Sequence, residues 1–249
     1  MIPALDVQAL HKRYKPDRPP AVEDLSFTIA PGEVLGLLGG NGAGKTTTIA
    51  MLLGLLVPTS GRILALGHDM ARDRFRALER MNFSSPYIAL PHRISVRENL
   101  RVYGHLYTVR GLESRIAELA ESLELVELLD RPAGELSAGQ KTRVALAKSL
   151  INRPALPLLD QPTASPDPHT GDWVRTRLEE YRAQSGCAIL LASHNMGEVE
   201  RLCDRVLMLK GGRVVDQGTP AGLIERYGRA DMEQVFLDIA RGTRVEAEA

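Results

Sequence analysis

The segment GGNGAGKT, at residues 39–46, constrains this chain more than any other stretch. Its spacing of glycines, followed by a lysine and a hydroxyl residue, matches the P-loop pattern. Glycines of this kind let backbone N–H groups turn inward around a phosphate. Lys45 would add a mobile positive charge for the β- and γ-phosphate oxygens, and Thr46 would offer a hydroxyl to Mg²⁺. The sequence therefore predicts a nucleotide-phosphate site.

The flanks of this segment agree with the prediction. An apolar run at Val34–Leu38 precedes it, and a helical pattern at Thr46–Leu56 follows it. Strand, loop and helix in this order are the context that a true P-loop requires, whereas a glycine-rich turn that matches by chance lacks them. The N-terminus of such a helix directs partial positive charge at bound phosphate.

Composition excludes several classes of protein. The 31 basic residues balance the 31 acidic ones, so no net field favours nucleic acid, and we expect no nucleic-acid partner. Cys187 and Cys203 are expected to be reduced, buried thiols of a cytosolic protein. No continuous stretch of apolar residues approaches the ~20 residues that a membrane-spanning helix needs. Any role at a membrane is therefore expected to depend on a partner.

Short apolar runs between turn signals predict an α/β fold with a largely parallel sheet. The predicted strands are Leu5–Leu10, Ser26–Ile29, Val34–Leu38, Arg62–Leu66, Met81–Ser85, Ala155–Asp160, Ala188–Ala192, Arg205–Leu209 and Val214–Gln217. The predicted helices are Thr46–Leu56, Ala71–Arg80, Lys141–Asn152, Trp173–Arg182, Met196–Cys203 and Ala221–Tyr227. Residues 96–129 show a helical pattern without any strand signal, which indicates a helical insertion, and residues 241–249 are expected to fray.

Two strands are expected to deliver polar side chains at their carboxyl ends. Asp160 ends an apolar run in the way expected of a buried parallel strand, which makes it a candidate Mg²⁺ ligand. His194 follows the strand at 188–192, although a histidine in this place is more often a surface residue.

Two further positions are candidates for ligand binding. Tyr14 could stack on a base or pack at a strand end, and residue type alone does not decide between these alternatives. Ser137, in the stretch Leu136–Gln140, is placed to cap the next helix, whose N-terminus is another potential anion site.

The order of P-loop, helical insertion, Leu136–Gln140, Asp160 and His194 resembles the nucleotide-binding domain of ABC transporters, over about residues 4–228. The resemblance implies an α/β P-loop NTPase (RecA-like) core with a parallel sheet, an N-terminal antiparallel β subdomain and an inserted α-helical subdomain. It implies a nucleotide-binding domain at residues 1–228, with the helical subdomain at about 86–140, and a C-terminal extension at 229–249.

The resemblance also implies the cofactors ATP and Mg²⁺ and a second nucleotide-binding domain, in a homodimer or a heterodimer. Each ATP would lie between the P-loop of one copy and the signature stretch of the other. Thr46 and Asp160 would bind the metal, and His194 would contact the γ-phosphate. The implied nucleotide-binding residues are Tyr14, Gly39, Asn41, Gly42, Ala43, Gly44, Lys45, Thr46 and Thr47 of one copy and Ser137, Gly139 and Gln140 of the other.

The implied activity is ATP hydrolysis coupled to transport through separate membrane subunits. The stretch Ser95–Leu100 and the single nucleotide domain look most like exporter ATPases. In such proteins residues corresponding to about 84–107 contact the transmembrane permease subunits, which would place this chain at the cytoplasmic face of the cell membrane. The alternatives are an ABC protein that does not act in transport and a regulatory ATP sensor that does not hydrolyse.

Gln161 departs from the family pattern at a chemically decisive position, where the family usually has a glutamate that deprotonates the attacking water. An amide holds water but does not take its proton at neutral pH, so general-base help of about 10²- to 10⁴-fold is expected to be lost. ATP binding is expected to survive. Two explanations stay open, a weakly hydrolytic site paired with a competent partner subunit and an engineered substitution that traps the ATP-bound dimer, and the otherwise intact motifs favour the trap.

Other departures are smaller. The glutamine expected after the Met81 strand is not evident, because Ser84, Ser85 and Pro86 occupy that region. Pro157 lies inside a strand that should be buried, which is unusual because proline removes a ladder donor. Pro166 replaces the apolar residue that usually precedes Asp167.

Overall fold

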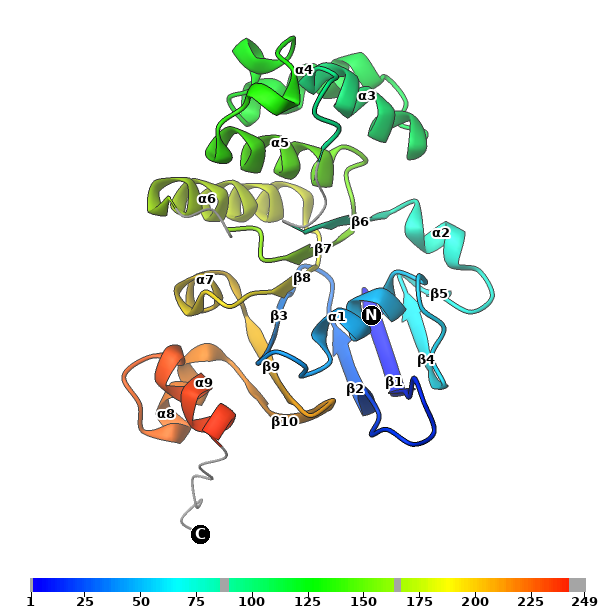
Figure 1. Cartoon of the computed structure of the whole chain (residues 1–249), viewed down its shortest axis with the longest axis vertical. Helices are drawn as coiled ribbons and strands as arrows, with labels where there is room; N and C mark the ends of the chain where they lie inside the picture. The colour runs from blue at the N-terminus through cyan, green and yellow to red at the C-terminus, as the bar shows by residue number, and fades with distance from the viewer. Residues whose placement is uncertain (1, 86–89, 164–166, 242–249) are drawn as a thin grey trace. The chain divides into compact units, whose positions relative to one another are not determined.

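A computed structural model describes residues 2–85, 90–163 and 167–241 of the chain. It divides into two compact units (Figure 1). The first unit comprises Met1–Leu78 and Ala188–Ala249, and the second comprises Glu79–Cys187. Pro86 and Pro166 lie outside the described residues, as do residues 242–249, which were expected to fray.

The first unit begins with an antiparallel sheet. Strand β1 (Leu5–Lys12) lies between β2 (Val22–Ile29) and β4 (Ser60–Ala65), and the short β5 (His68–Asp69) extends the order to β2-β1-β4-β5. Buried and exposed side chains alternate along Leu25–Ile29 of β2, so that one face of this strand is buried and the other meets solvent. This confirms the antiparallel β part of the predicted fold class.

The rest of the first unit is a parallel sheet with one antiparallel strand. Strand β3 (Val34–Gly39) runs parallel to both β8 (Ile189–Ala192) and β9 (Arg205–Lys210), and β10 (Arg213–Gly218) pairs antiparallel with β9. All residues of β3 and β8 are buried, as expected of strands covered on both faces. The helices of this unit are α1 (Lys45–Leu52), α2 (Arg74–Leu78), α7 (Met196–Leu202), α8 (Pro220–Tyr227) and α9 (Met232–Arg241).

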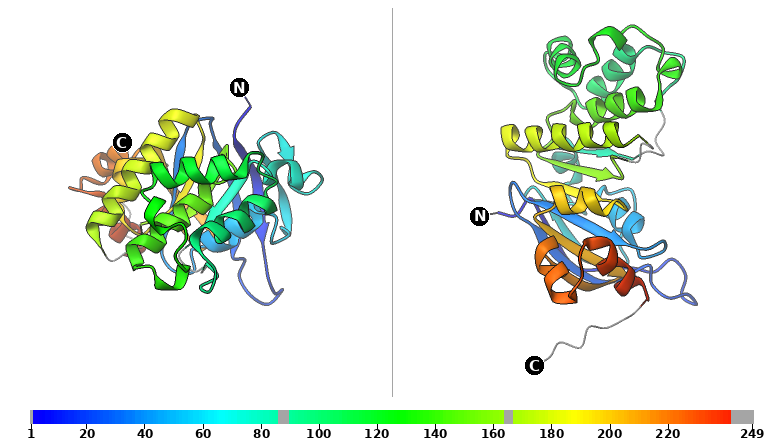
Figure 2. Two further views of the ribbon diagram at one scale, coloured as in Figure 1. Left: turned by 90° about the horizontal axis from the view of Figure 1, so that it is seen from above. Right: turned by 90° about the vertical axis from the view of Figure 1, so that its left-hand side faces the viewer.

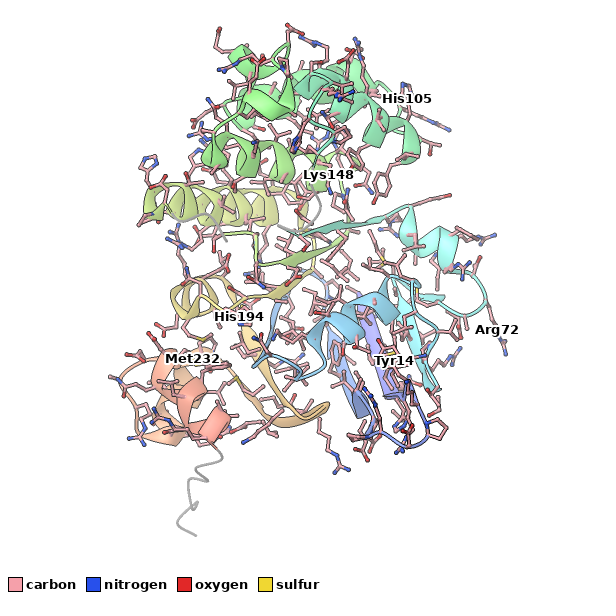
Figure 3. All side chains as sticks on the ribbon, in the orientation of Figure 1. Tyr14, Arg72, His105, Lys148, His194 and Met232 are labelled. Carbon is pink, nitrogen blue, oxygen red and sulfur yellow. The ribbon has the colours of Figure 1, made fainter. Side chains whose placement is uncertain are left out.

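The sequence analysis did not predict α9, the last described helix. Met232 and Val235 on this helix are fully buried, and the Lys210 ammonium donates to the Ile239 carbonyl oxygen at 2.9 Å. Figure 2 shows α8 and α9 side by side next to β9 and β10, and Figure 3 labels Met232 there. The apolar spacing of 232, 235 and 239 is a helical signal that could have revealed the element.

The second unit combines two strands with four helices. Strands β6 (Met81–Ser84) and β7 (Leu156–Asp160) are parallel. The helices are α3 (Val96–Leu106), α4 (Leu112–Ser122), α5 (Ala138–Leu150) and α6 (Pro168–Ser185), with short 3₁₀ turns at Val126–Leu128 and Ala133–Glu135. The predicted helical insertion is therefore present.

Local chemistry explains where these helices start and stop. Ser95 and Glu98 form a reciprocal capping box at the start of α3. Gly111, at φ +62°, gives the chain the left-handed residue that separates α3 from α4. Asp167 caps α6 and Pro168 occupies its first turn, so the helix starts five residues before the predicted Trp173.

Two further expectations have a structural outcome. Strand β7 continues through Pro157, which lies opposite Asn82 of β6. Cys187 and Cys203 are buried free thiols, as predicted. None of the described helices is long and apolar enough to cross a membrane.

Candidate functional site

The predicted phosphate loop joins β3 to α1 and leaves no room for side chains at two of its glycines. A β-carbon on Gly39 would lie 2.5 Å from the Leu209 carbonyl oxygen and 2.7 Å from the β-carbon of Ala43. Gly44 has φ +102°, and a β-carbon there would lie 2.6 Å from the Ala21 carbonyl oxygen. The path of the loop therefore depends on glycine at both positions.

Lys45 lies at the start of α1, where its ammonium is directed back over the loop. It donates to the carbonyl oxygen of Gly39 and to that of Gly40, the latter at 3.2 Å. These carbonyls hold the positive charge at the concave side of the loop. A phosphate would meet a cation that is already in position.

The N-terminus of α1 has the properties of an anion site. Its N-cap is Gly44, and no side chain of the described residues caps it. No acidic residue lies in the first turn. The first N–H groups of a helix have no intrahelical partner, so anions are favoured at this end. Thr46 is exposed here and Thr47 follows it.

Tyr14 lies close to this helix and is 60% exposed. Its hydroxyl is 3.4 Å from Thr47 Oγ1, and the Lys12 ammonium lies 5.5 Å from the centre of its ring. The ring is therefore not packed into a core, and its exposure favours the base-stacking alternative over the packing one. Figure 3 labels Tyr14.

His194 is exposed and lies just beyond β8. Because β3 and β8 run parallel with Leu37 opposite Ala192, the phosphate loop and His194 follow two strands that end at the same edge of the sheet. The turn that carries His194 is fixed by its neighbours. Asn195 N–H donates to the buried Ser193 hydroxyl at 3.0 Å, and the Asn195 side chain caps α7.

The second unit places Asp160 at the carboxyl end of β7. The Ser85 hydroxyl, which follows the parallel strand β6, donates to Asp160 Oδ2 at 3.4 Å. Ser85 is buried and stands in the region where the expected glutamine is missing. The sequence analysis gave Ser85 no role, and only the pairing of β6 with β7 brings it to the carboxylate.

Gln161, directly after Asp160, has a left-handed backbone with φ +50°. Few residues other than glycine adopt this conformation, which costs on the order of 1–3 kcal/mol and is concentrated at functional sites. The sequence predicted the chemical importance of this position but not its backbone strain.

Ser137 and Gln140 form a reciprocal capping box at the start of α5. Gln140 N–H donates to Ser137 Oγ at 3.2 Å, and Ser137 N–H donates to Gln140 Oε1 at 2.9 Å. The prediction that Ser137 caps this helix is confirmed. The box uses the acceptor oxygen of each side chain, so it does not consume the Ser137 hydroxyl hydrogen or the Gln140 amide hydrogens.

Gly139 packs against α6. A β-carbon at this position would lie 2.8 Å from Thr170 Oγ1, and that hydroxyl donates to Asp167 Oδ2 at 2.6 Å. Hydrogen bonds to the Asp167 carboxylate hold its pKa below its usual range. The bond from the Thr170 hydroxyl is the largest cause, and the backbone N–H groups of Thr170 and His169 also contribute. The start of α5 is thus in direct contact with the start of α6.

A second link between these helices was missed by the sequence analysis. Trp173 Nε1 donates to Glu124 Oε1 at 2.9 Å, and the guanidinium groups of Arg143 and Arg177 lie 4.7 and 5.5 Å from the centre of its ring. Both arginines also form ion pairs with Glu124. The indole hydrogen bond is the largest cause that lowers the pKa of Glu124. We call these four residues the tryptophan cluster.

The predicted site residues therefore fall into two groups. The first unit holds the phosphate loop, Tyr14 and His194, and the second unit holds Asp160, Gln161 and the stretch 137–140. Across the described residues, no group of three or more His, Cys, Asp or Glu side chains could hold a metal by itself. Mg²⁺ in phosphate sites commonly takes only one or two protein oxygens beside phosphate and water, and the Thr46 hydroxyl of the first unit and the Asp160 carboxylate of the second are each an oxygen ligand of a kind that it takes.

Comparisons with known proteins agree on one family. The family described as "ABC transporter" matches residues 22–164. The Nod factor export ATP-binding protein I of Rhizobium sp. (strain N33) is 40% identical over 217 residues, which cover 86% of this chain and 71% of that protein.

Two solved structures give the same result. The ATP-binding subunit of an ABC transporter superposes with a TM-score of 0.85 and 28% identity, covering 95% of this chain and 99% of that one. A subunit from Clostridium perfringens, described as part of an ABC transporter complex, has a TM-score of 0.79 and 30% identity and covers 97% of both chains.

Proposed function

Because this chain belongs to the ATP-binding proteins of the ABC transporter family, we propose that it is the ATPase subunit of a membrane transporter. Two nucleotide-binding domains close around two ATP molecules, and separate membrane subunits convert the closure into transport. The relatives named as export proteins favour export as the direction. The chain then works at the cytoplasmic face of the membrane, held there by its partners.

One observation carries the proposal most strongly, namely the phosphate loop that is already formed around Lys45. The path of the loop is fixed by the fold, because Gly39 and Gly44 are packed against backbone oxygens. The ammonium of Lys45 and the uncapped start of α1 add positive potential at the same place. Residues 39–47 hold the phosphates, and Tyr14 stacks on the base.

The opposite side of each ATP is supplied by Ser137, Gly139 and Gln140 of the second domain. The hydroxyl and amide hydrogens that the capping box leaves available donate to the γ-phosphate. Backbone N–H groups at the start of α5 add to this anion site. This arrangement makes dimerisation depend on the presence of the γ-phosphate.

Mg²⁺, when bound with ATP, neutralises phosphate charge and orients the phosphates. The Thr46 hydroxyl and the Asp160 carboxylate would be its protein ligands, and the hydrogen bond from Ser85 would keep the carboxylate in place. His194 contacts the γ-phosphate from the sheet edge that also carries the phosphate loop.

Hydrolysis requires a base for the attacking water, and Gln161 is a poor one. The amide of Gln161 positions a water by hydrogen bonds but does not accept its proton at neutral pH. The chain consequently binds ATP, dimerises and hydrolyses slowly.

The permease subunits contact the region of residues 84–107, which includes α3. We assign residues 1–228 to the nucleotide-binding domain, with its helical part at about 86–140, and residues 229–249 to a C-terminal extension.

Calorimetric titration of the purified chain with ATP and Mg²⁺ tests the binding step, and light scattering of the same samples tests dimerisation. We expect binding in the micromolar range, dimers with ATP and monomers with ADP. Lys45→Ala should abolish both effects, whereas Lys15→Ala, at an exposed loop lysine, should change neither. Equal dimer formation with ADP, or undiminished binding by Lys45→Ala, would contradict the proposal.

A further inference from the structure

Lys148, on α5, is a buried cation for which the described residues provide no ion pair and no hydrogen-bond acceptor. Only 5% of its surface is exposed, and its ammonium lies 5.0 Å from the centre of the Tyr103 ring. Figure 3 labels Lys148. Within residues 2–85, 90–163 and 167–241, the ammonium forms no ion pair and no hydrogen bond with a side chain or carbonyl. Asn82 contacts this residue only at its backbone carbonyl, at 3.1 Å.

Arg115, another buried cation of the second unit, has the partners that Lys148 lacks. It is also 5% exposed, but it forms an ion pair with Glu118 at 2.6 Å. It donates in addition to the carbonyl oxygens of Leu150 at 2.5 Å and Ile151 at 3.2 Å. Among the described residues, the fold therefore gives Arg115 an ion pair and two carbonyl acceptors but gives the Lys148 ammonium only an aromatic ring.

This difference has an energetic consequence. Taking an ion out of water is costly, and a cation placed over an aromatic ring recovers only part of that cost. Burial accordingly lowers the pKa of Lys148. A carboxylate brought close to the ammonium would remove this penalty, because it would favour the charged form.

The helix that carries Tyr103, α3, has an exposed apolar side. On α3, Val102 is 48% and Leu106 is 73% exposed, and Tyr103 lies between them on the helix. Val102 and Leu106 are four residues apart, so they lie on one face. Gly104, on the other side of α3, packs against Leu112 of α4. The exposed face of α3 is therefore directed away from α4. We call Val102, Tyr103 and Leu106, together with the buried Lys148 of α5 that lies against Tyr103, the α3 docking face.

We propose that the α3 docking face binds a segment of the membrane subunit that carries one acidic residue among apolar ones, and that this acid pairs with Lys148. Charge complementarity selects this occupant, because an apolar segment alone would leave the lysine uncompensated and a basic one would be repelled. The inference rests on the proposed contact of residues 84–107 with the permease and adds the chemistry of recognition.

The test uses two synthetic helical peptides of leucine and alanine, identical except for a glutamate or a glutamine at the centre of the apolar face. Fluorescence anisotropy of labelled peptides measures their affinity for the full chain. We expect the glutamate peptide to bind at least about tenfold more tightly, because close charge pairs at interfaces contribute strongly. Lys148→Met should abolish the difference, Lys148→Arg should retain it, and Lys15→Met should leave it unchanged.

A carbodiimide cross-link provides a second measurement that does not depend on folding of a variant. The reagent joins a carboxylate to a nearby amine, and mass spectrometry of the digest identifies the lysine. We expect Lys148 to be joined to the peptide glutamate. Cross-links only at other lysines, or equal affinity for both peptides, would refute the role of Lys148 while leaving an apolar docking face. Binding of neither peptide would refute the proposed permease contact itself.

Discussion

Thr170 Oγ1 occupies the space that a β-carbon of residue 139 would need, since the two atoms would be 2.8 Å apart. The hydroxyl is not free to move away, because it is held by Asp167 at 2.6 Å and the residue is buried. Gly139 belongs to the stretch that contacts the opposite ATP in the proposed dimer, and Asp167 begins α6. This packing ties the two elements together.

Gly139→Ala should therefore impair dimerisation more than ATP binding by the monomer. The added methyl group displaces the start of α5 from Thr170, which misplaces Ser137 and Gln140 for a γ-phosphate. We expect a loss of ATP-dependent dimers in light scattering, with calorimetric affinity for ATP within about threefold of the native value. Ala138→Gly, next to it on the exposed side, is the matched control and should dimerise normally. Normal dimers of Gly139→Ala would show that this contact is not needed.

Replacing Lys148 by methionine should stabilise the isolated chain. Exchange of a poorly compensated buried ion for an apolar side chain of similar length is commonly neutral or stabilising by about 1–4 kcal/mol. Arg115→Met is the contrasting variant, since it removes the side-chain donor to two carbonyl oxygens and one of the two ion pairs of Glu118, which keeps Arg153, and it should destabilise by about 1–3 kcal/mol. Urea denaturation measures both free energies of unfolding. A marked loss of stability in Lys148→Met would show that the lysine is compensated within the chain.

The C-terminal helix α9 should contribute substantially to stability. Met232 is fully buried, and a buried Met→Ala substitution costs about 2–5 kcal/mol. Glu233→Ala, at the exposed neighbouring position, should change the free energy of unfolding by no more than about 0.5 kcal/mol. Thermal and urea unfolding of both variants provide the comparison, and similar midpoints for the two would mean that α9 is not docked in solution.

The tryptophan cluster predicts a specific pH dependence. The pKa of Glu124 is lowered in the folded chain, first by the Trp173 hydrogen bond and also by the nearby arginines. A carboxyl of this kind contributes stability that is present above its unfolded pKa of about 4.3 and is lost as the pH falls through its folded pKa. Its side chain is about half exposed, so we expect a contribution of no more than about 1 kcal/mol, which salt should reduce.

Glu124→Gln should accordingly show a smaller loss of stability than the native chain does as the pH falls from about 5 to about 3, the range around and below the unfolded pKa. Circular dichroism is suitable for both proteins, and fluorescence of Trp173, the single tryptophan, reports on the cluster directly. Parallel pH profiles of the two proteins would contradict this account.

Much of the fold and of the site could be predicted from local sequence. The phosphate loop, the capping role of Ser137 and the strand that ends at Asp160 depend on short-range chemistry, namely glycine geometry, helix capping and apolar periodicity. The features that escaped prediction depend on contacts between residues far apart in the chain. Ser85 meets Asp160 only because β6 and β7 pair, and Trp173 meets Glu124 only because α6 packs near the end of α4.

The sequence also did not predict where some helices end or which residues have a left-handed backbone. The helix predicted for Thr46–Leu56 ends at Leu52, because the chain turns at Gly54, whose φ is +66°. The left-handed backbone of Gln161 has no sequence signal, since glutamine has no preference for this conformation. Strain of this type is visible only once the surrounding structure is known.

The most direct test of the central claim is steady-state ATP turnover of the chain with Gln161 and with Gln161→Glu, alone and assembled with its membrane subunits. The account predicts that glutamate raises turnover by about 10²-fold or more, because it restores the missing base, while ATP affinity stays within a few fold. ATP-dependent dimers should then become short-lived. Unchanged turnover would contradict the account, because it would show that residue 161 does not limit hydrolysis at this site.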